Sequence, residues 1–155
     1  KLLAERESVV THPGSFPGDE DFDSTITLLG EEYSVVNSHL QSVYGERWRE
    51  VFRYLVERSD AGHHDTLWVS RDPLLLTVEV FYFIYEEMAV SLADVVFRRS
   101  HIGSAECPDQ STLSRLCQIM GEELDWDDEE RGSQIEKVLK NYGFLQANPS
   151  PAALA

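Results

Sequence analysis

The sequence contains little cysteine, which excludes several classes of small stabilised domain. Cys107 and Cys117 are the two cysteines of the 155-residue chain, and they form no Cys-x-x-Cys pair. A disulfide framework or a zinc finger needs more cysteines at closer spacing. We therefore expect a reducing compartment, and we interpret both cysteines as structural or incidental.

Basic residues and long apolar runs are also scarce. The chain has 13 Lys and Arg against 28 Asp and Glu, which gives a formal net charge of -15. This charge repels the phosphates of nucleic acids and of anionic membrane surfaces, so we expect no nucleic-acid partner. The most apolar stretch, VEVFYFIY, contains Glu79 and is followed by Glu86 and Glu87. A membrane-spanning helix needs about 18 consecutive apolar residues, and none is expected here.

Motifs that carry catalysis are missing from the sequence. It has no nucleophile elbow, no phosphate-binding glycine loop and no Gly-x-Gly-x-x-Gly fingerprint. His63, His64 and Asp65 form the densest cluster of possible metal ligands, but adjacent histidines project in different directions. The acidic stretch GEELDWDDEE lacks the glycine of a calcium loop. We therefore assign no catalytic, cofactor-binding or metal-binding residue.

Apolar residues recur at helical spacing through most of the chain. They predict an all-α fold of about seven short helices in an irregular orthogonal bundle, with no strand. Two helices are expected between Asp21 and Tyr44, interrupted near 32–37, and Gly45 should close the second with a left-handed backbone. The other helices are expected at 46–59, from Thr77 to Met88, from Ser91 onward, around the stripe Leu113, Leu116, Cys117 and Met120, and from Asp127 to Gly143 around the stripe Ile135, Val138, Leu139 and Tyr142.

Three parts of the chain differ in composition. Residues 1–20 contain two Pro-Gly steps and an acidic cluster, which is typical of an irregular arm or linker. Residues 21–144 carry the helical pattern and are expected to form the domain. Residues 145–155 are short of charge and contain prolines, and we expect a disordered tail. The start lacks an initiator methionine and a signal-peptide pattern, so the chain is interpreted as a piece of a longer protein.

Two adjacent arginines follow the expected helix start at Ser91, which has the capping-box partner Asp94 three residues later. Arg98 lies four residues after Asp94, so we predict an exposed ion pair between them. Arg99 is in line with the apolar stripe of this helix and needs a carboxylate if it is partly buried. We expect the partner of Arg99 to be Glu87, on the apolar face of the preceding helix, in an ion pair from which water is largely excluded. Both pairs are predicted to be structural; a small-anion site and a contact with another domain remain as alternatives for Arg99.

The stretch EVFYFIYEEMAVSLADVVFRRSHIG resembles the C-terminal helical domain of FAD-dependent glycerol-3-phosphate dehydrogenases. In that family a glutamate, an alanine, a capped Ser/Thr-x-x-Asp start and an Arg-Arg-Ser/Thr end recur in this order. YGERW, LDWDDEERGSQIE and THPGSFPG resemble further segments of the same domain, and the likeness covers about 11–142. Phe97 stands where a tryptophan is common. The matching residues here are Glu87, Ala89, Ser91, Asp94, Arg98, Arg99 and Ser100.

The resemblance implies a function for the parent protein rather than for this fragment. The family oxidises glycerol 3-phosphate to dihydroxyacetone phosphate and passes electrons through FAD to a membrane quinone. Its flavin and phosphate contacts lie in an N-terminal portion, so the fragment is expected to bind no cofactor and to be inactive alone. Its expected role is structural and in assembly, with the FAD-binding catalytic domain as its partner. We expect a cytoplasmic location, with the parent peripheral on the inner face of the membrane and any membrane contact made through the parent.

Two other functions remain open on the sequence alone. A free-standing acidic helical adaptor would bind a protein partner through an exposed apolar face. A small acidic enzyme would use an unrecognised site around His63, His64 and Asp65, and bound zinc or iron would indicate it.

Overall fold

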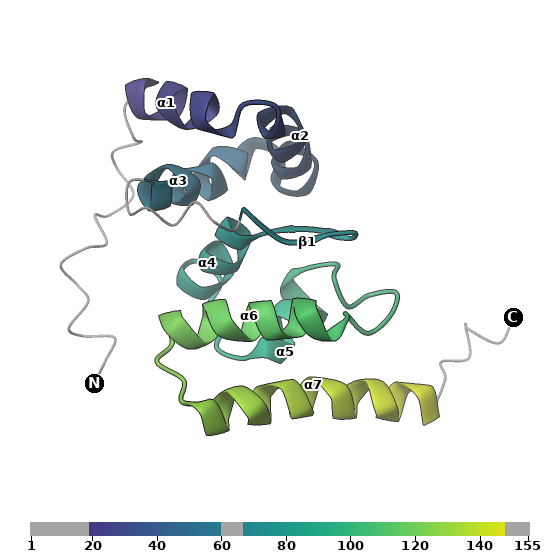
Figure 1. Ribbon diagram of the computed structural model, residues 1–155. Helices are drawn as coiled ribbons and strands as arrows, with labels where there is room; N and C mark the ends of the chain where they lie inside the picture. The colour runs from purple at the N-terminus through teal and green to yellow at the C-terminus, as the bar shows by residue number, and fades with distance from the viewer. Residues whose placement is uncertain (1–18, 60–66, 148–155) are drawn as a thin grey trace, which may run out of the picture. The chain divides into compact units, whose positions relative to one another are not determined.

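The computed structural model describes residues 19–59 and 67–147 (Figure 1). The chain divides into two compact units, Lys1–His63 and His64–Ala155. The histidine cluster at 63–65 and most of the predicted arm lie outside the described residues, as does the end of the predicted tail. Among the described helices, none is both long enough and apolar enough to cross a membrane.

The described elements of the first unit are helices. They are α1 (Asp19–Leu29), α2 (Glu32–Tyr44), a 3₁₀ turn η1 (Gly45–Arg47) and α3 (Trp48–Ser59). The predicted interruption within 32–37 is wrong, because the break lies at Gly30 with φ 52°, and its amide donates to Ile26 O at 3.1 Å. A glycine takes this positive φ without a steric cost. Gly45 follows α2 with a positive φ of 56°, but its ψ of −127° lies outside the left-handed helical region that the sequence predicts.

The core of the first unit comes from one face of α2 and one face of α3. Val36 and Leu40 are buried on α2, and Val51 and Phe52 are buried on α3. The Trp48 ring meets the Phe52 ring edge-on, with their centroids 5.8 Å apart. The helical spacing predicts the packed face of α3, whereas on α2 it also includes Val35 and Val43, which are exposed.

The second unit begins with a β-hairpin that the sequence does not predict. Strands β1 (Trp68–Arg71) and β2 (Leu74–Leu76) pair antiparallel, with Arg71 opposite Leu74. Strands this short show too little alternation to be recognised, and the three leucines of β2 continue directly into helix α4 (Thr77–Tyr85). At that junction the buried Glu79 carboxylate accepts a 2.8 Å hydrogen bond from the Leu76 amide.

The other described elements of the second unit are helices. A single turn of α-helix, α5 (Leu92–Asp94), continues as a π-helix, η2 (Val95–Arg99), and is followed by α6 (Gln110–Glu123) and α7 (Asp128–Ala147). In Figure 1, α6 and α7 pack side by side and are joined at one end, so they run antiparallel. The predicted stripe on α6 is confirmed, because all four of its members are buried: Leu113, Leu116, Cys117 and Met120.

Helix α7 differs from its prediction in length and in its buried face. It continues past Gly143 to Ala147, because one interior glycine costs only about 1 kcal/mol and does not by itself end a helix. Val138 and Tyr142 are buried as predicted, but Leu139 is exposed, and Gln134 is buried. The predicted start is confirmed, because Asp127 Oδ1 accepts from the Glu130 amide at 2.8 Å.

The helical fold class is confirmed. The described residues contain six α-helices of nine residues or more, and the single hairpin is the only sheet among them. The strands correct the expectation of a purely helical chain, and β2 adds the buried Leu75 and Leu76 to a core that is otherwise mostly helical.

Candidate functional site

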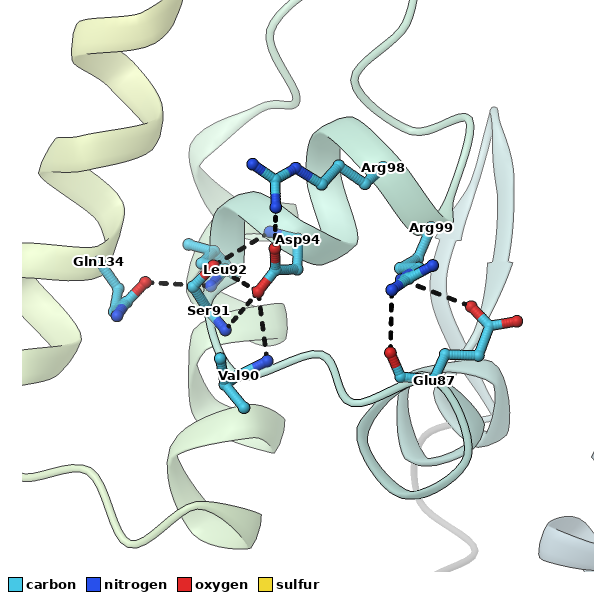
Figure 2. Close-up of polar contacts among 8 residues, drawn as sticks. All are labelled: Glu87, Val90, Ser91, Leu92, Asp94, Arg98, Arg99 and Gln134. Carbon is cyan, nitrogen blue, oxygen red and sulfur yellow. Dashed lines mark hydrogen bonds and ion pairs between the residues drawn. The ribbon is translucent and has the colours of Figure 1, made fainter.

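The segment from Glu87 to Arg99 holds the residues that the sequence singles out, and polar contacts organise it (Figure 2). Helix α4 ends at Tyr85, three residues before the predicted end at Met88. The chain then turns with Met88 at φ 56°, and the Ala89 amide donates to Phe83 O at 2.8 Å. Glu87 therefore lies in a turn, not on the apolar face of a helix as predicted.

A reciprocal capping box starts α5, as the Ser91 and Asp94 spacing predicts. The Asp94 amide donates to Ser91 Oγ at 3.2 Å, and the Ser91 amide donates to Asp94 Oδ2 at 3.0 Å. The same Oδ2 accepts from Ser91 Oγ at 2.7 Å and from the Val90 amide at 3.2 Å. One carboxylate thus satisfies two amides that the helix itself leaves without a partner.

These contacts set the charge state of Asp94. Burial raises the pKa of the carboxyl, but hydrogen bonds from the Ser91 side chain and from the Val90 and Ser91 amides, together with the charge of Arg98, outweigh it. The pKa of Asp94 therefore lies below its ordinary value of 3.8. The carboxylate is charged throughout the neutral range.

Helix α7 supplies a contact that sequence reasoning misses. Gln134 Oε1 accepts a 3.0 Å hydrogen bond from the buried Leu92 amide, and Gln134 Nε2 donates to Glu130 Oε1 at 2.7 Å. The Leu92 amide belongs to the first turn of α5, where helix amides need outside partners. Its partner is 42 positions away in the sequence, so no local spacing predicts the pair. The one available signal is a glutamine next to the apolar stripe of α7.

Arg98 makes the surface pair that its spacing suggests. Its Nη1 lies 3.0 Å from Asp94 Oδ1, and 74% of its side chain is exposed. An ion pair as exposed as this contributes about 0.5 kcal/mol or less.

Arg99 pairs with Glu87, but not in the environment that the sequence predicts. Arg99 Nε is 3.6 Å from Glu87 Oε2, and the side chains are 41% and 27% exposed. The shorter contact goes to the backbone, because Arg99 Nη2 donates to Glu87 O at 2.9 Å. Figure 2 shows the guanidinium contacting Glu87 at two places, its backbone carbonyl oxygen and one carboxylate oxygen. The prediction that water is largely excluded from this ion pair is therefore wrong.

The local helix type explains the error. Residues 95–99 form a π-helix, in which the Ser100 amide donates to Val95 O, five residues earlier, at 3.1 Å. The wider turn breaks the 3.6-residue periodicity that placed Arg99 on the buried stripe. Val95 and Val96 remain buried, whereas Arg99 is exposed.

The geometry of this segment favours an internal role for both arginines. Each guanidinium already contacts a carboxylate from the same segment, and Arg99 also holds a backbone carbonyl. An incoming phosphate would have to displace these contacts and approach the carboxylates of Glu87 and Asp94. Among the described residues, no group of three or more His, Cys, Asp and Glu side chains is placed to hold a metal ion.

Burial shifts the pKa values of the two cysteines and of Tyr142. Burial raises the pKa of the Cys107 thiol, and burial raises that of Cys117 against the opposing charge of Arg131. Neither thiol is therefore activated as a nucleophile. Tyr142 donates from its hydroxyl to Gly103 O at 2.7 Å, and burial, with a smaller contribution from Cys107, raises its pKa to about 12.

Comparison with known proteins identifies the family. Residues 12–131 match the family described as the C-terminal domain of alpha-glycerophosphate oxidase. The chain belongs to this family. The matched segment contains the whole 87–99 network apart from its α7 contact, because Gln134 lies beyond it.

The relatives of this glycerophosphate oxidase C-terminal domain are much longer proteins. The chain is 29% identical over 135 residues to "Glycerol-3-phosphate dehydrogenase, mitochondrial" of Macaca fascicularis and of Homo sapiens. The match covers 79% of this chain but only 18% of each relative. No solved structure gives a significant match.

FAD is the cofactor that this family implies, and the described residues do not fit it. Dinucleotide binding uses a glycine-rich turn between a strand and a helix in a parallel sheet. The described strands instead form one antiparallel hairpin, and β2 passes into α4 through Leu76 and Thr77 without a glycine. Nothing in this part of the chain offers a cradle for a pyrophosphate, so we derive no flavin chemistry from its residues.

Proposed function

We propose that the chain is the C-terminal accessory domain of an FAD-dependent glycerol-3-phosphate dehydrogenase. The parent would oxidise glycerol 3-phosphate to dihydroxyacetone phosphate and deliver two electrons through FAD to a quinone. Family membership and the names of the two relatives support the parent activity. The chain spans about 18% of the relatives' length, so the catalytic machinery is assigned to the remainder.

The role of the domain itself is structural and in assembly, with the FAD-binding catalytic domain as its partner. The observation that carries this proposal is the use of the charged groups between Glu87 and Arg99. Asp94 caps a helix, and Arg99 clasps a backbone turn. Groups that are used in this way build a surface of defined shape and do not capture a substrate. We place the domain in the cytoplasm, with the parent peripheral on the inner face of the membrane.

The test compares the full-length parent protein with this chain alone and with a parent truncated before Thr11. The full-length protein should show flavin absorbance and glycerol 3-phosphate-dependent reduction of a soluble quinone analogue, whereas this chain alone should show neither. A parent truncated before Thr11 should lose activity through loss of folded protein, because apolar surface becomes uncovered.

Three outcomes would contradict the proposal. A yellow, active preparation of this chain alone would place the chemistry within it. A full-length protein without glycerol 3-phosphate oxidation would remove the parent activity. A truncated parent as stable and as active as the full-length protein would remove the assembly role and leave an adaptor function.

A further inference from the structure

The turn 86–90, which follows α4, directs apolar side chains outward. Met88 is 79% exposed and Val90 is 64% exposed, while Ala89 between them is buried. Their backbone neighbours in the turn carry the carboxylates of Glu86 and Glu87. The result is a small apolar patch; the Glu87 carboxylate of the same turn lies 3.6 Å from Arg99 Nε.

Polar contacts fix this turn from several sides. Arg99 Nη2 donates to Glu87 O at 2.9 Å, the Ala89 amide donates to Phe83 O at 2.8 Å, and the Val90 amide donates to Asp94 Oδ2 at 3.2 Å. Figure 2 shows the Arg99 and Asp94 side chains meeting the turn from the helical segment that follows it. The backbone that carries the two exposed apolar side chains is therefore held in one conformation.

The conformation is also unfavourable for the residue at its tip. Met88 has φ 56°, which lies in the left-handed region that a non-glycine residue adopts only at a steric cost. Such strain persists only where surrounding contacts impose it, and it concentrates at sites of binding. A glycine would remove the cost, but it would also remove the most exposed large apolar side chain of the patch.

We propose that the turn 86–90 is the surface on which this domain docks onto the catalytic part of its own polypeptide. This inference rests on the proposed function. The chain spans only 18% of its relatives' length, so most of the parent lies outside it and is tethered to it. A tethered partner is present at high effective concentration, so a small patch is sufficient for docking.

The partner surface has a defined chemistry. It presents an apolar pocket for Met88 and Val90, with Lys or Arg side chains around that pocket. Basic groups suit this domain in general, because its formal net charge is -15 and opposite charge favours the correct orientation of docking.

The test measures thiol labelling at two positions of the full-length parent. Met88→Cys places a thiol in the turn, and Leu139→Cys places one on the exposed side of α7, where Leu139 is 48% exposed. Labelling by a maleimide is followed peptide by peptide with mass spectrometry, and each rate is divided by the rate in urea-unfolded protein. From exposure alone, the Met88→Cys thiol should react faster than the Leu139→Cys thiol.

Docking at the turn 86–90 should reverse the order of the two labelling rates. We expect the Met88→Cys thiol to react at least about tenfold more slowly than the Leu139→Cys thiol, since intramolecular docking closes the site for most of the time. Equal rates, or faster reaction at Met88→Cys, would overturn the proposal. Protection that disappears on dilution would assign the turn to a second copy, and protection that requires added anionic phospholipid vesicles would assign it to a membrane; both results contradict docking onto the catalytic part.

The same samples separate this inference from the proposed function. Flavin absorbance and glycerol 3-phosphate oxidation are measured on both variants before labelling. An active parent with an unprotected Met88→Cys thiol refutes the docking surface and leaves the function intact. A protected thiol in a parent without glycerol 3-phosphate oxidation refutes the function and leaves the docking surface.

Discussion

Replacing Asp94 with alanine tests the architectural role of the 87–99 network most sharply. The substitution removes the acceptor for the Ser91 amide, the Ser91 hydroxyl and the Val90 amide. Loss of a helix cap costs about 0.5–2 kcal/mol, and a hydrogen bond to a charged group contributes about 1.5–3 kcal/mol. Val90 is exposed, so its amide can bind water instead. We therefore expect Asp94→Ala to lower the free energy of unfolding by about 2 kcal/mol.

The assay is urea unfolding of the chain, followed by circular dichroism at 222 nm. Arg98→Ala is the matched control, because it removes only the exposed partner of the same carboxylate and should cost about 0.5 kcal/mol or less. If Asp94→Ala costs no more than Arg98→Ala, the carboxylate is not a cap, and the reasoning is refuted.

The pH dependence of Asp94→Asn gives a second measurement of the same group. The pKa of Asp94 is lowered in the folded protein from its ordinary 3.8. The stabilisation from its charge is therefore complete above the ordinary pKa and is lost as the pH falls through the folded pKa. The difference in unfolding free energy between wild type and Asp94→Asn should be constant from about pH 7 to pH 5 and shrink below about pH 4. A difference that grows on acidification would contradict the assignment.

Four further substitutions test other contacts by the same urea assay. Gly103→Ala should destabilise by about 1–3 kcal/mol through overpacking, because an added Cβ would lie 2.7 Å from Val96 O; a neutral effect would contradict this packing. Gln134→Ala should lower the free energy of unfolding by about 1–3 kcal/mol. It should also speed hydrogen exchange at the Leu92 amide, which loses its acceptor; unchanged exchange would show that the contact is dispensable. Arg99→Ala should cost more than Glu87→Gln, because the guanidinium also holds the Glu87 carbonyl; equal costs would mean that only the ion pair matters.

The sequence predicts the helical cores well because they depend on local periodicity. The α6 stripe and the capped starts at Ser91 and Asp127 each rest on residues within one or two helical turns. The predictions fail where the backbone leaves the regular α-helix. The β1–β2 hairpin, for example, is too short to show alternation. Gly143 is a different kind of error, because α7 continues as a helix through it.

The candidate site shows the same division between local and distant contacts. The Asp94–Arg98 pair follows from four-residue spacing. The Glu87–Arg99 pairing is present but partly exposed to solvent, because α4 ends early and η2 is a π-helix. The contact between Gln134 and the first turn of α5 joins distant parts of the chain, and only the folded structure brings these parts together.

An NMR titration of the chain with glycerol 3-phosphate tests most directly whether the arginines serve the fold rather than a ligand. The Nε–Hε resonances of Arg98 and Arg99 report on each guanidinium, and inorganic sulfate at equal ionic strength is the reference anion. The account predicts the same small, non-saturating shifts with both anions. Saturating shifts at Arg98 or Arg99 with glycerol 3-phosphate alone would show a substrate site in this domain and contradict the account.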